Sequence, residues 1–442
     1  MASAVAPDAP PLPRLVSAPQ AAEDALVVLS AGEQEGCTET LELAVAFERC
    51  ADAGALAESY ARTLVLFPPC AGRYVKRTVE VEGLPAPEAR RCILCNNAGA
   101  GYCYVKLDGK MPPMVGALPD AFFDRAVCVR PMTDGSLGGP LLRTRIMDFD
   151  DGQLVTFSFT RGLADIGGMG LFLQVWSRLC RGEDPGPAPT HRRTILEAAL
   201  RGEPGYRVET GYALLHRRGE PPEEPRAPAR PGPPTMTLAC FVLSAEELRV
   251  TGEELSQSCR KKRLIYDSES LTDAELAFSL VSSSIFGSDQ VPASLSLDLR
   301  STFMVDRHFG SVRGVVDIDL PQDRVQAAGV LHRHPTPALQ RDFWNWKRIQ
   351  PVEGPSARLE LSSWLEALGT LDELSFGGGL VTGVTTGGAY WQQYLDGRGA
   401  DCPAYTVLLP HPSGALQVQA LLPRAVADRI GNERPCQVWH PA

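Results

Sequence analysis

Apolar residues recur along this chain with two different periods, which predict both strands and helices. Residues Leu154–Thr160 alternate and place three large apolar side chains on one side, which predicts a strand with one strongly apolar face. Residues Met169–Arg181 repeat leucine or valine every four positions, as a packed helix does. Residues Asp52–Leu66 have the same helical character and end before two prolines. Thr272 and Glu275 form a capping-box pattern that predicts the start of another helix.

Strand and helix patterns alternate in both halves of the chain, which favours α/β layering. Further strands are expected at Ala25–Ser30, Leu295–Leu299 and Val312–Leu320. Residues 217–236 contain seven prolines and many charges, so they predict an extended connector. The predicted organisation is a weakly ordered tail, an N-terminal domain, a Pro-rich crossover linker and a C-terminal domain, with bounds 1–24, 25–200, 201–236 and 237–442.

Composition narrows the class of protein. The 442 residues are 44% hydrophobic and 22% charged, enough to bury the cores of two domains. A net charge of −10 argues against nucleic acid or an anionic membrane surface as a partner. The apolar runs are too short to span a membrane, and the proline-rich N-terminus does not resemble a secretory signal. We therefore expect a cytoplasmic protein.

The cysteines and histidines give weak signals. The twelve cysteines are scattered, and we expect reduced thiols rather than a disulfide framework. Cys92 and Cys95 form a lone CxxC without a second pair at zinc-site spacing, so we expect neither a bound metal nor another bound cofactor. His332 and His334 have no partner motif and are expected at the surface.

Residues Phe157–Glu183 are the most informative stretch. A strand enters, Arg161 and Asp165 follow in a turn, glycines come next, and an apolar helix leaves. This junction resembles that of the BAHD acyl-CoA-dependent acyltransferases, in the chloramphenicol acetyltransferase-like superfamily, which carry HxxxDG here. Other segments resemble the family's motifs in the family's order: 66–73 (LFPPCAGR), 297–301 (LDLRS), 308–311 (HFGS), 361–364 (LSSW), 374–379 (LSFGGG), 407–410 (VLLP) and 421–424 (LLPR).

The resemblance implies a fold and a reaction. It implies two chloramphenicol acetyltransferase-like α/β domains joined by a crossover, with a channel between them. Acyl-CoA is implied as co-substrate, and the hydroxyl or amine of a small molecule as acceptor. In the family, the motif histidine takes the acceptor proton, and the aspartate pairs with the arginine of the "DlR" strand. Asp165 and Arg300 match that structural pair.

The resemblance also assigns channel residues and cellular properties. Ser375, Phe376, Gly377 and Gly379 match a family motif and are expected to line the substrate and CoA channel, together with Thr272. The family is usually monomeric, so a monomer is expected. The resemblance also implies a function in secondary metabolism.

The sequence departs from the family at the chemical centre. Arg161 occupies the position of the catalytic histidine, and a guanidinium has no lone pair with which to accept a proton. Ile166 replaces the glycine after the motif aspartate, while Ser375 and Gly378 replace an aspartate and a tryptophan. The tryptophan–arginine pair expected on the helix after Thr272 is absent.

Three interpretations stay open. The protein is an acyl-CoA-dependent O- or N-acyltransferase with a replaced base, transferring acyl groups other than aminoacyl. Alternatively, the site performs a different reaction, such as a cyclisation or condensation. The third interpretation is a non-catalytic homologue that binds a small ligand or a protein partner. Arg161 itself either stabilises a developing oxyanion, binds a substrate carboxylate, or forms only a local ion pair with Asp165.

Overall fold

The structure, a computed structural model, divides the chain into two compact units. Unit 1 comprises Met1–Gly211, Asp298–Val312 and Glu366–Gln393, and unit 2 comprises Tyr212–Leu297, Arg313–Leu365 and Tyr394–Ala442. The residues described are 14–19, 25–37, 39–49, 51–80, 87–123, 138–191, 193, 236–266, 268, 270–285, 290–298, 300, 306–311, 313–333, 359–368, 371–392, 404–433 and 436–439. Most of the expected linker, 201–235, lies outside them.

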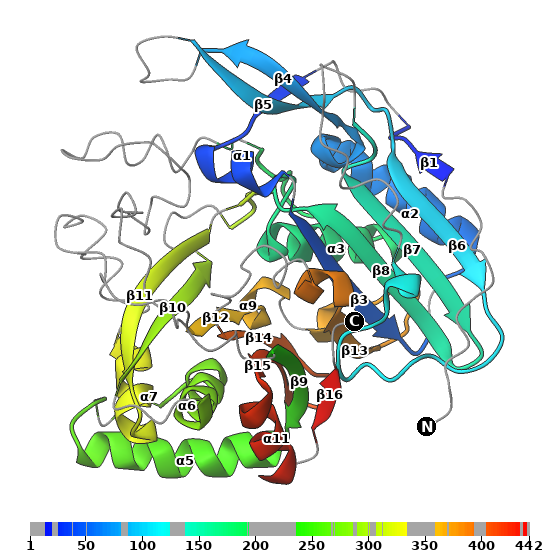
Figure 1. The fold of residues 1–442 in the computed structure, drawn as a ribbon. Helices are drawn as coiled ribbons and strands as arrows, with labels where there is room; N and C mark the ends of the chain where they lie inside the picture. Colours follow the sequence, from blue (N-terminus) through cyan, green and yellow to red (C-terminus); the bar gives the residue numbers. More distant parts are fainter. Residues whose placement is uncertain are drawn as a thin grey trace. The chain divides into compact units, whose positions relative to one another are not determined.

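Unit 1 is built on two sheets. Its six-stranded sheet has the order β1-β6-β7-β8-β3-β13, and its three-stranded sheet has the order β2-β5-β4 (Figure 1). The strands are β1 (Arg14–Val16), β2 (Ala25–Val28), β3 (Thr40–Phe47), β4 (Arg73–Val79), β5 (Glu88–Cys95), β6 (Ala100–Lys106), β7 (Leu142–Phe149), β8 (Gly152–Thr160) and β13 (Val381–Thr386).

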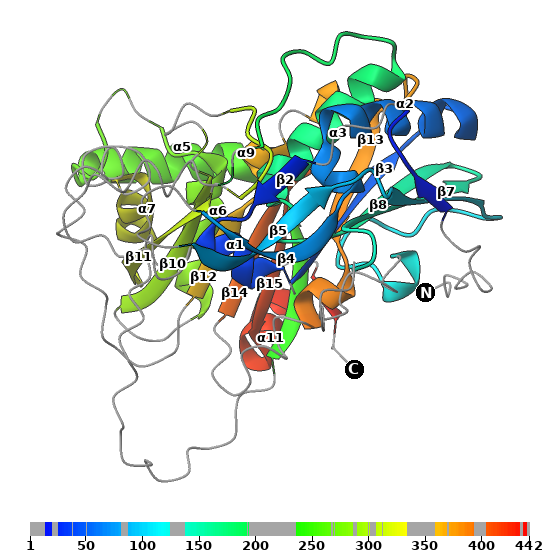
Figure 2. The ribbon, with the colours of Figure 1, turned by 90° about the horizontal axis from the view of Figure 1, so that it is seen from above.

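The helices of unit 1 are α1 (Ala31–Gly36), α2 (Ala53–Leu66) and α3 (Ile166–Cys180). Figure 2 shows α2 and α3 together on one face of the six-stranded sheet. Asp52 caps α2 by accepting hydrogen bonds from the N–H groups of Gly54 and Ala55, and the prolines at 68 and 69 end this helix as expected. Trp176 of α3 is fully buried and donates to the Ser59 hydroxyl of α2, so the two helices are joined by a polar bond inside the core.

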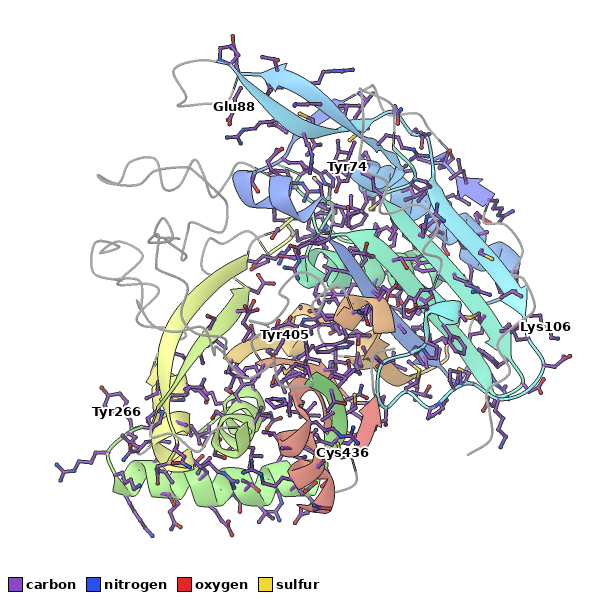
Figure 3. The ribbon with its side chains drawn as sticks, in the orientation of Figure 1. Tyr74, Glu88, Lys106, Tyr266, Tyr405 and Cys436 are labelled. Atoms are coloured by element: carbon purple, nitrogen blue, oxygen red, sulfur yellow. The ribbon has the colours of Figure 1, made fainter. Side chains whose placement is uncertain are left out.

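Unit 2 contains a seven-stranded sheet with the order β11-β10-β12-β14-β15-β9-β16. The strands are β9 (Met236–Leu243), β10 (Gln290–Asp298), β11 (Arg313–Pro321), β12 (Leu359–Ser363), β14 (Ala404–Pro410), β15 (Leu416–Pro423) and β16 (Gln437–Trp439). Its described helices include α5 (Ala245–Lys261), α6 (Asp273–Ile285), α7 (Arg324–Arg333) and α11 (Arg424–Glu433). The short helix α9 (Leu365–Leu368) begins with the last residue of a unit 2 segment, and its other residues belong to unit 1. Strands β10, β12 and β14 are parallel neighbours, whereas β14, β15, β9 and β16 pair antiparallel. Tyr405 of β14 is buried, while Tyr266, after α5, is exposed (Figure 3).

Both units therefore have the mixed α/β construction that the hydrophobic pattern predicts. Three details differ from expectation. Arg14–Val16 pair with β6 as β1, so this part of the expected tail is ordered because it satisfies the backbone groups of an edge strand. Both faces of β8 are buried, because Leu154 on its second face packs with Leu118 and Phe122. His332 is largely buried and pairs with Glu275 at 3.2 Å rather than lying on the surface.

Among the described residues, no helix has the length and apolar character needed to cross a lipid bilayer. The described cysteines form no disulfide with one another. No group of three or more potential metal ligands is found within the described part of the chain.

Candidate active site

The turn between β8 and α3 carries the first site residue, Asp165. Asp165 is the N-cap of α3, and its carboxylate accepts a hydrogen bond from the Gly168 N–H at 2.8 Å. This bond satisfies one of the backbone donors that every helix leaves open at its start. A carboxylate at this position also interacts favourably with the positive end of the helix dipole. The sequence Asp-Ile-Gly-Gly therefore begins the helix directly after the turn.

The same carboxylate binds Arg300, which also belongs to unit 1. Arg300 donates to Asp165 at 2.6 and 3.2 Å, and to Asp298 at 2.7 Å. Its two remaining N–H groups donate to the carbonyl oxygens of His308 and Gly310, at 3.1 and 2.6 Å. All five guanidinium donors are satisfied, which a largely buried arginine requires. Burial alone would lower the pKa of Arg300, but the two carboxylates raise it above its ordinary value.

Gly167 leaves the space that this arginine fills. A Cβ atom at Gly167 would collide with the guanidinium of Arg300 and with the carboxylate of Asp298. The turn thus needs a residue without a side chain two positions after Asp165. Ile166, which replaces the family's glycine, begins α3 and is itself buried.

Arg161, which the sequence resemblance places at the family's base position, forms an ion pair with Glu39. The Nη1 atom of Arg161 lies 3.0 Å from the Glu39 carboxylate, and the side chains are 16% and 36% exposed. The two residues are also joined through the backbone, because the Arg161 N–H donates to the Glu39 carbonyl at 2.9 Å. Thr40 pairs with Thr160 in the antiparallel β3–β8 ladder, so Glu39 and Arg161 continue that register. Asp165, for its part, is held by Arg300.

Tyr74 and Cys37 lie close to the end of β8, but both are poor proton acceptors. A Cβ at Gly162 would contact both the Tyr74 hydroxyl and the Cys37 sulfur, which shows how close they are. Tyr74 of β4 hydrogen-bonds with the Thr160 hydroxyl (Figure 3). Burial raises the pKa of Cys37 to about 11, and burial also raises the pKa of Tyr74. Both groups are therefore protonated near neutral pH.

A buried network around Glu33 lies on the other side of the same turn. One oxygen of Glu33 caps α1 together with Ser30. The other oxygen accepts from Arg193 at 2.8 Å and from the Ser311 N–H at 2.9 Å. The side chains of Arg193 and Glu33 are 0% and 1% exposed, so this is a fully buried ion pair. It connects α1 to the segment that supplies Arg300.

The two described histidines of this region, His191 and His308, are weak bases. Burial, followed by the charges of Arg193 and Arg300, lowers the pKa of His308 to about 3. Burial and Arg193 lower the pKa of His191 to about 4. His308 is completely buried and bonds through Nδ1 with the Thr190 hydroxyl. A buried imidazole with so low a pKa is both inaccessible and a weak base.

The 375–379 segment lies at the opposite end of α3. Ser177, in the last turn of α3, bonds with both the N–H and the carbonyl of Ser375, each at 2.9 Å. Asp165 begins the same helix twelve residues earlier, which is roughly 18 Å along the axis. Phe376 is buried against Trp176, with ring centroids 4.5 Å apart.

The structure explains why two positions of this segment are glycine. Gly377 has a φ of 75°, a left-handed conformation that favours glycine. A Cβ at Gly379 would collide with the Arg49 carbonyl. The described contacts of residues 375–379 are thus hydrogen bonds and packing contacts that hold the segment in unit 1, and their assignment to a channel stays a prediction.

Thr272, the remaining predicted site residue, belongs to unit 2. Its hydroxyl accepts from the Glu275 N–H at 3.3 Å, while the Glu275 carboxylate accepts from the Thr272 N–H at 2.7 Å. The expected capping box at the start of α6 is thereby confirmed.

Sequence reasoning missed Glu33, Glu39 and Arg193. Ser30 and Glu33 have capping-box spacing, so the helix start was available from the sequence. The partners Arg193 and Arg161 are distant in sequence, and only the folded register brings them to these carboxylates.

Comparisons with known proteins agree with this architecture. Residues 45–220 match the model of the Transferase family. The fold is similar to that of F. sporotrichioides TRI101 in complex with coenzyme A and T-2, with a TM-score of 0.61, 16% identity and coverage of 93% of this chain and 99% of that one. Vinorine synthase gives a TM-score of 0.61 at 14% identity, covering 94% of this chain and 95% of that one. No curated protein matches the sequence.

The fold also resembles a condensation domain. The first condensation domain of the calcium-dependent antibiotic synthetase gives a TM-score of 0.58 at 13% identity, covering 93% of this chain and 94% of that one. The chain thus shares the mixed α/β fold of these solved structures. The Transferase family match over residues 45–220 and this fold agree with the resemblance to the BAHD acyltransferases.

The ion cluster gives a prediction about stability. Arg300→Met leaves the carboxylates of Asp165 and Asp298 without their common cation, so we expect a loss of about 3–5 kcal/mol in unfolding free energy. Urea denaturation measures this loss. The matched control is Arg249→Met, which breaks only exposed ion pairs with Glu246 and Glu253 and should leave the unfolding free energy nearly unchanged. Equal effects of the two variants would contradict a special role for the cluster.

His308 gives a prediction about pH. Its pKa is lower in the folded protein than in the unfolded chain, so the unfolded state binds more protons as the pH falls below about 6.5. Stability conferred by the neutral ring is present above that pH and declines toward pH 3, by up to roughly 1.4 kcal/mol per pH unit. We expect His308→Gln to flatten the decline of Tm between pH 6.5 and 4. His411 is only partly buried and burial lowers its pKa as well, so His411→Gln should remove a smaller part of the decline than His308→Gln.

Proposed function

We propose that the protein is an acyl-CoA-dependent acyltransferase that works without the family's histidine. It moves an acyl group from CoA to the hydroxyl or amine of a small molecule. The Transferase family match supports acyl transfer, and the likeness to TRI101, whose structure holds coenzyme A, supports CoA as the donor carrier. We also propose a cytoplasmic monomer of secondary metabolism that acts without a bound cofactor or metal.

The observation that carries this proposal is the intact turn around Asp165. Asp165 caps α3 and, with Asp298, holds Arg300, whose five N–H groups are all used. This cluster fixes the end of β8, where the family's base is located, in one conformation. Because the residues around that position are held in place, the geometry favours a site that can catalyse a reaction over one that has lost its structure.

Catalysis without a histidine is energetically accessible. A general base contributes ~10²–10⁴-fold to rate, and positioning of the reactants contributes a further large part. A thioester is already activated toward attack. The positive charge of Arg161 would stabilise the oxyanion that develops on the thioester carbonyl as the acceptor attacks.

A second candidate function is binding without catalysis. The Arg161–Glu39 ion pair favours it, because a guanidinium already neutralised by a carboxylate is less available for an oxyanion. In this function the chain binds a small ligand or a protein partner and performs no transfer.

Calorimetry with CoA and acetyl-CoA tests the donor side. We expect micromolar binding, near −8 kcal/mol, because the proposed function requires a donor site. The measurement uses the full chain, with circular dichroism to show that it is folded. Absence of binding by folded protein would overturn the CoA-dependent proposal and leave the binding function.

Arg161→His tests the base position directly. Restoring an imidazole should raise acyl transfer to alcohol acceptors by ~10²–10⁴-fold, because a neutral imidazole can take the hydroxyl proton. Initial rates of free CoA release measure the change, with Arg161→Lys as a cationic control. An unchanged rate in folded, acetyl-CoA-binding protein would argue for the non-catalytic function.

A further inference from the structure

The proton acceptor is the missing part of the proposed site. Near the end of β8, the described side chains that carry lone pairs include Cys37, Tyr74, Glu33 and Glu39. Cys37 and Tyr74 are buried and protonated at neutral pH. Glu33 is 1% exposed and fully engaged with Arg193 and the backbone. Glu39 differs from these three because its side chain is 36% exposed and ionisable.

Glu39 is also in the right place. Its carboxylate lies 3.0 Å from the guanidinium of Arg161, the residue at the family's base position. The N–H of Arg161 donates to the Glu39 carbonyl, so the backbone fixes the register of the two residues. Arg161 therefore holds the Glu39 carboxylate in a defined position through the ion pair.

We infer that Glu39 accepts the proton in this site and that the acceptor substrate is a weakly basic amine rather than an alcohol. The inference rests on the proposed function and names its substrate class. A carboxylate is a weaker base than an imidazole, so it takes a proton from a neutral alcohol less readily than from a nitrogen that has become positively charged. A weakly basic amine, such as an aromatic amine, is already neutral at working pH and attacks without prior deprotonation.

The bond changes balance without another reactant. The amine nitrogen forms a bond to the thioester carbonyl carbon, and the nitrogen becomes positively charged and acidic. Glu39 takes one proton from that nitrogen while Arg161 faces the carbonyl oxygen. The carbon–sulfur bond then breaks, the sulfur leaves as the CoA thiolate, and the proton passes from Glu39 to that thiolate. The products are an amide and CoA.

The test compares acceptors and variants in the full chain. Acetyl-CoA is offered with a panel of aromatic amines and a matched panel of phenols and alcohols. We expect amines to be turned over much faster than alcohols. Glu39→Gln keeps an oxygen for Arg161 but cannot take a proton, so kcat for amines should fall by ~10²–10⁴-fold with little change in KM. Glu39→Asp should retain part of the activity.

The matched control is Glu48→Gln. Glu48 directly follows β3, whereas Glu39 directly precedes it, so the same chemical change is made at opposite ends of one strand. This control should retain wild-type rates.

The outcomes separate the two proposals. Absence of acetyl-CoA binding by folded protein overturns the proposed function and the inference together. Binding with turnover of alcohols at rates comparable to those of amines overturns the inference alone. Binding without turnover of either panel overturns the acyltransferase function and the inference with it, whereas a Glu39→Gln variant as fast as wild type overturns the role of Glu39 alone.

Discussion

The carboxylate of Asp165 is the point on which the described site depends. It begins α3 by binding the Gly168 N–H, and it binds Arg300 from a segment far along the chain. Neither role can be separated from the other, because the same oxygen atom serves both bonds. Gly167 has no side chain because the guanidinium occupies the space where one would be. The start of α3, the end of β8 and the ion cluster around Arg300 therefore depend on the same carboxylate. The position of Arg161, at the end of β8, depends on it as well.

The local structure was largely readable from the sequence, whereas the partners were not. The period of β8 and α3, the prolines after α2 and the Thr272–Glu275 cap depend on neighbouring residues and were predicted correctly. The second apolar face of β8 was missed because the segment that covers it is distant in sequence.

The partners of charged side chains depend on the fold rather than on local pattern. The pairing of Asp165 with Arg300 was expected only through the resemblance to a family, since spacing alone offered Arg161 as an alternative. Glu39 was not considered, although an antiparallel β3–β8 register places it beside Arg161. A pattern of apolar residues determines which face of a strand is buried, but it does not determine which strand lies next to it.

Strand β13 has a consequence for how the protein is made. It pairs with β3, so Thr386 lies opposite Leu43, and the same unit also receives Arg300 from beyond the midpoint of the chain. During synthesis, β3 has an open edge and Asp165 lacks its cation until most of the polypeptide has emerged from the ribosome. Residues 1–211 alone would therefore be an incomplete fragment rather than a domain. Such long-range closure slows folding, and an open edge strand exposes the nascent chain to aggregation.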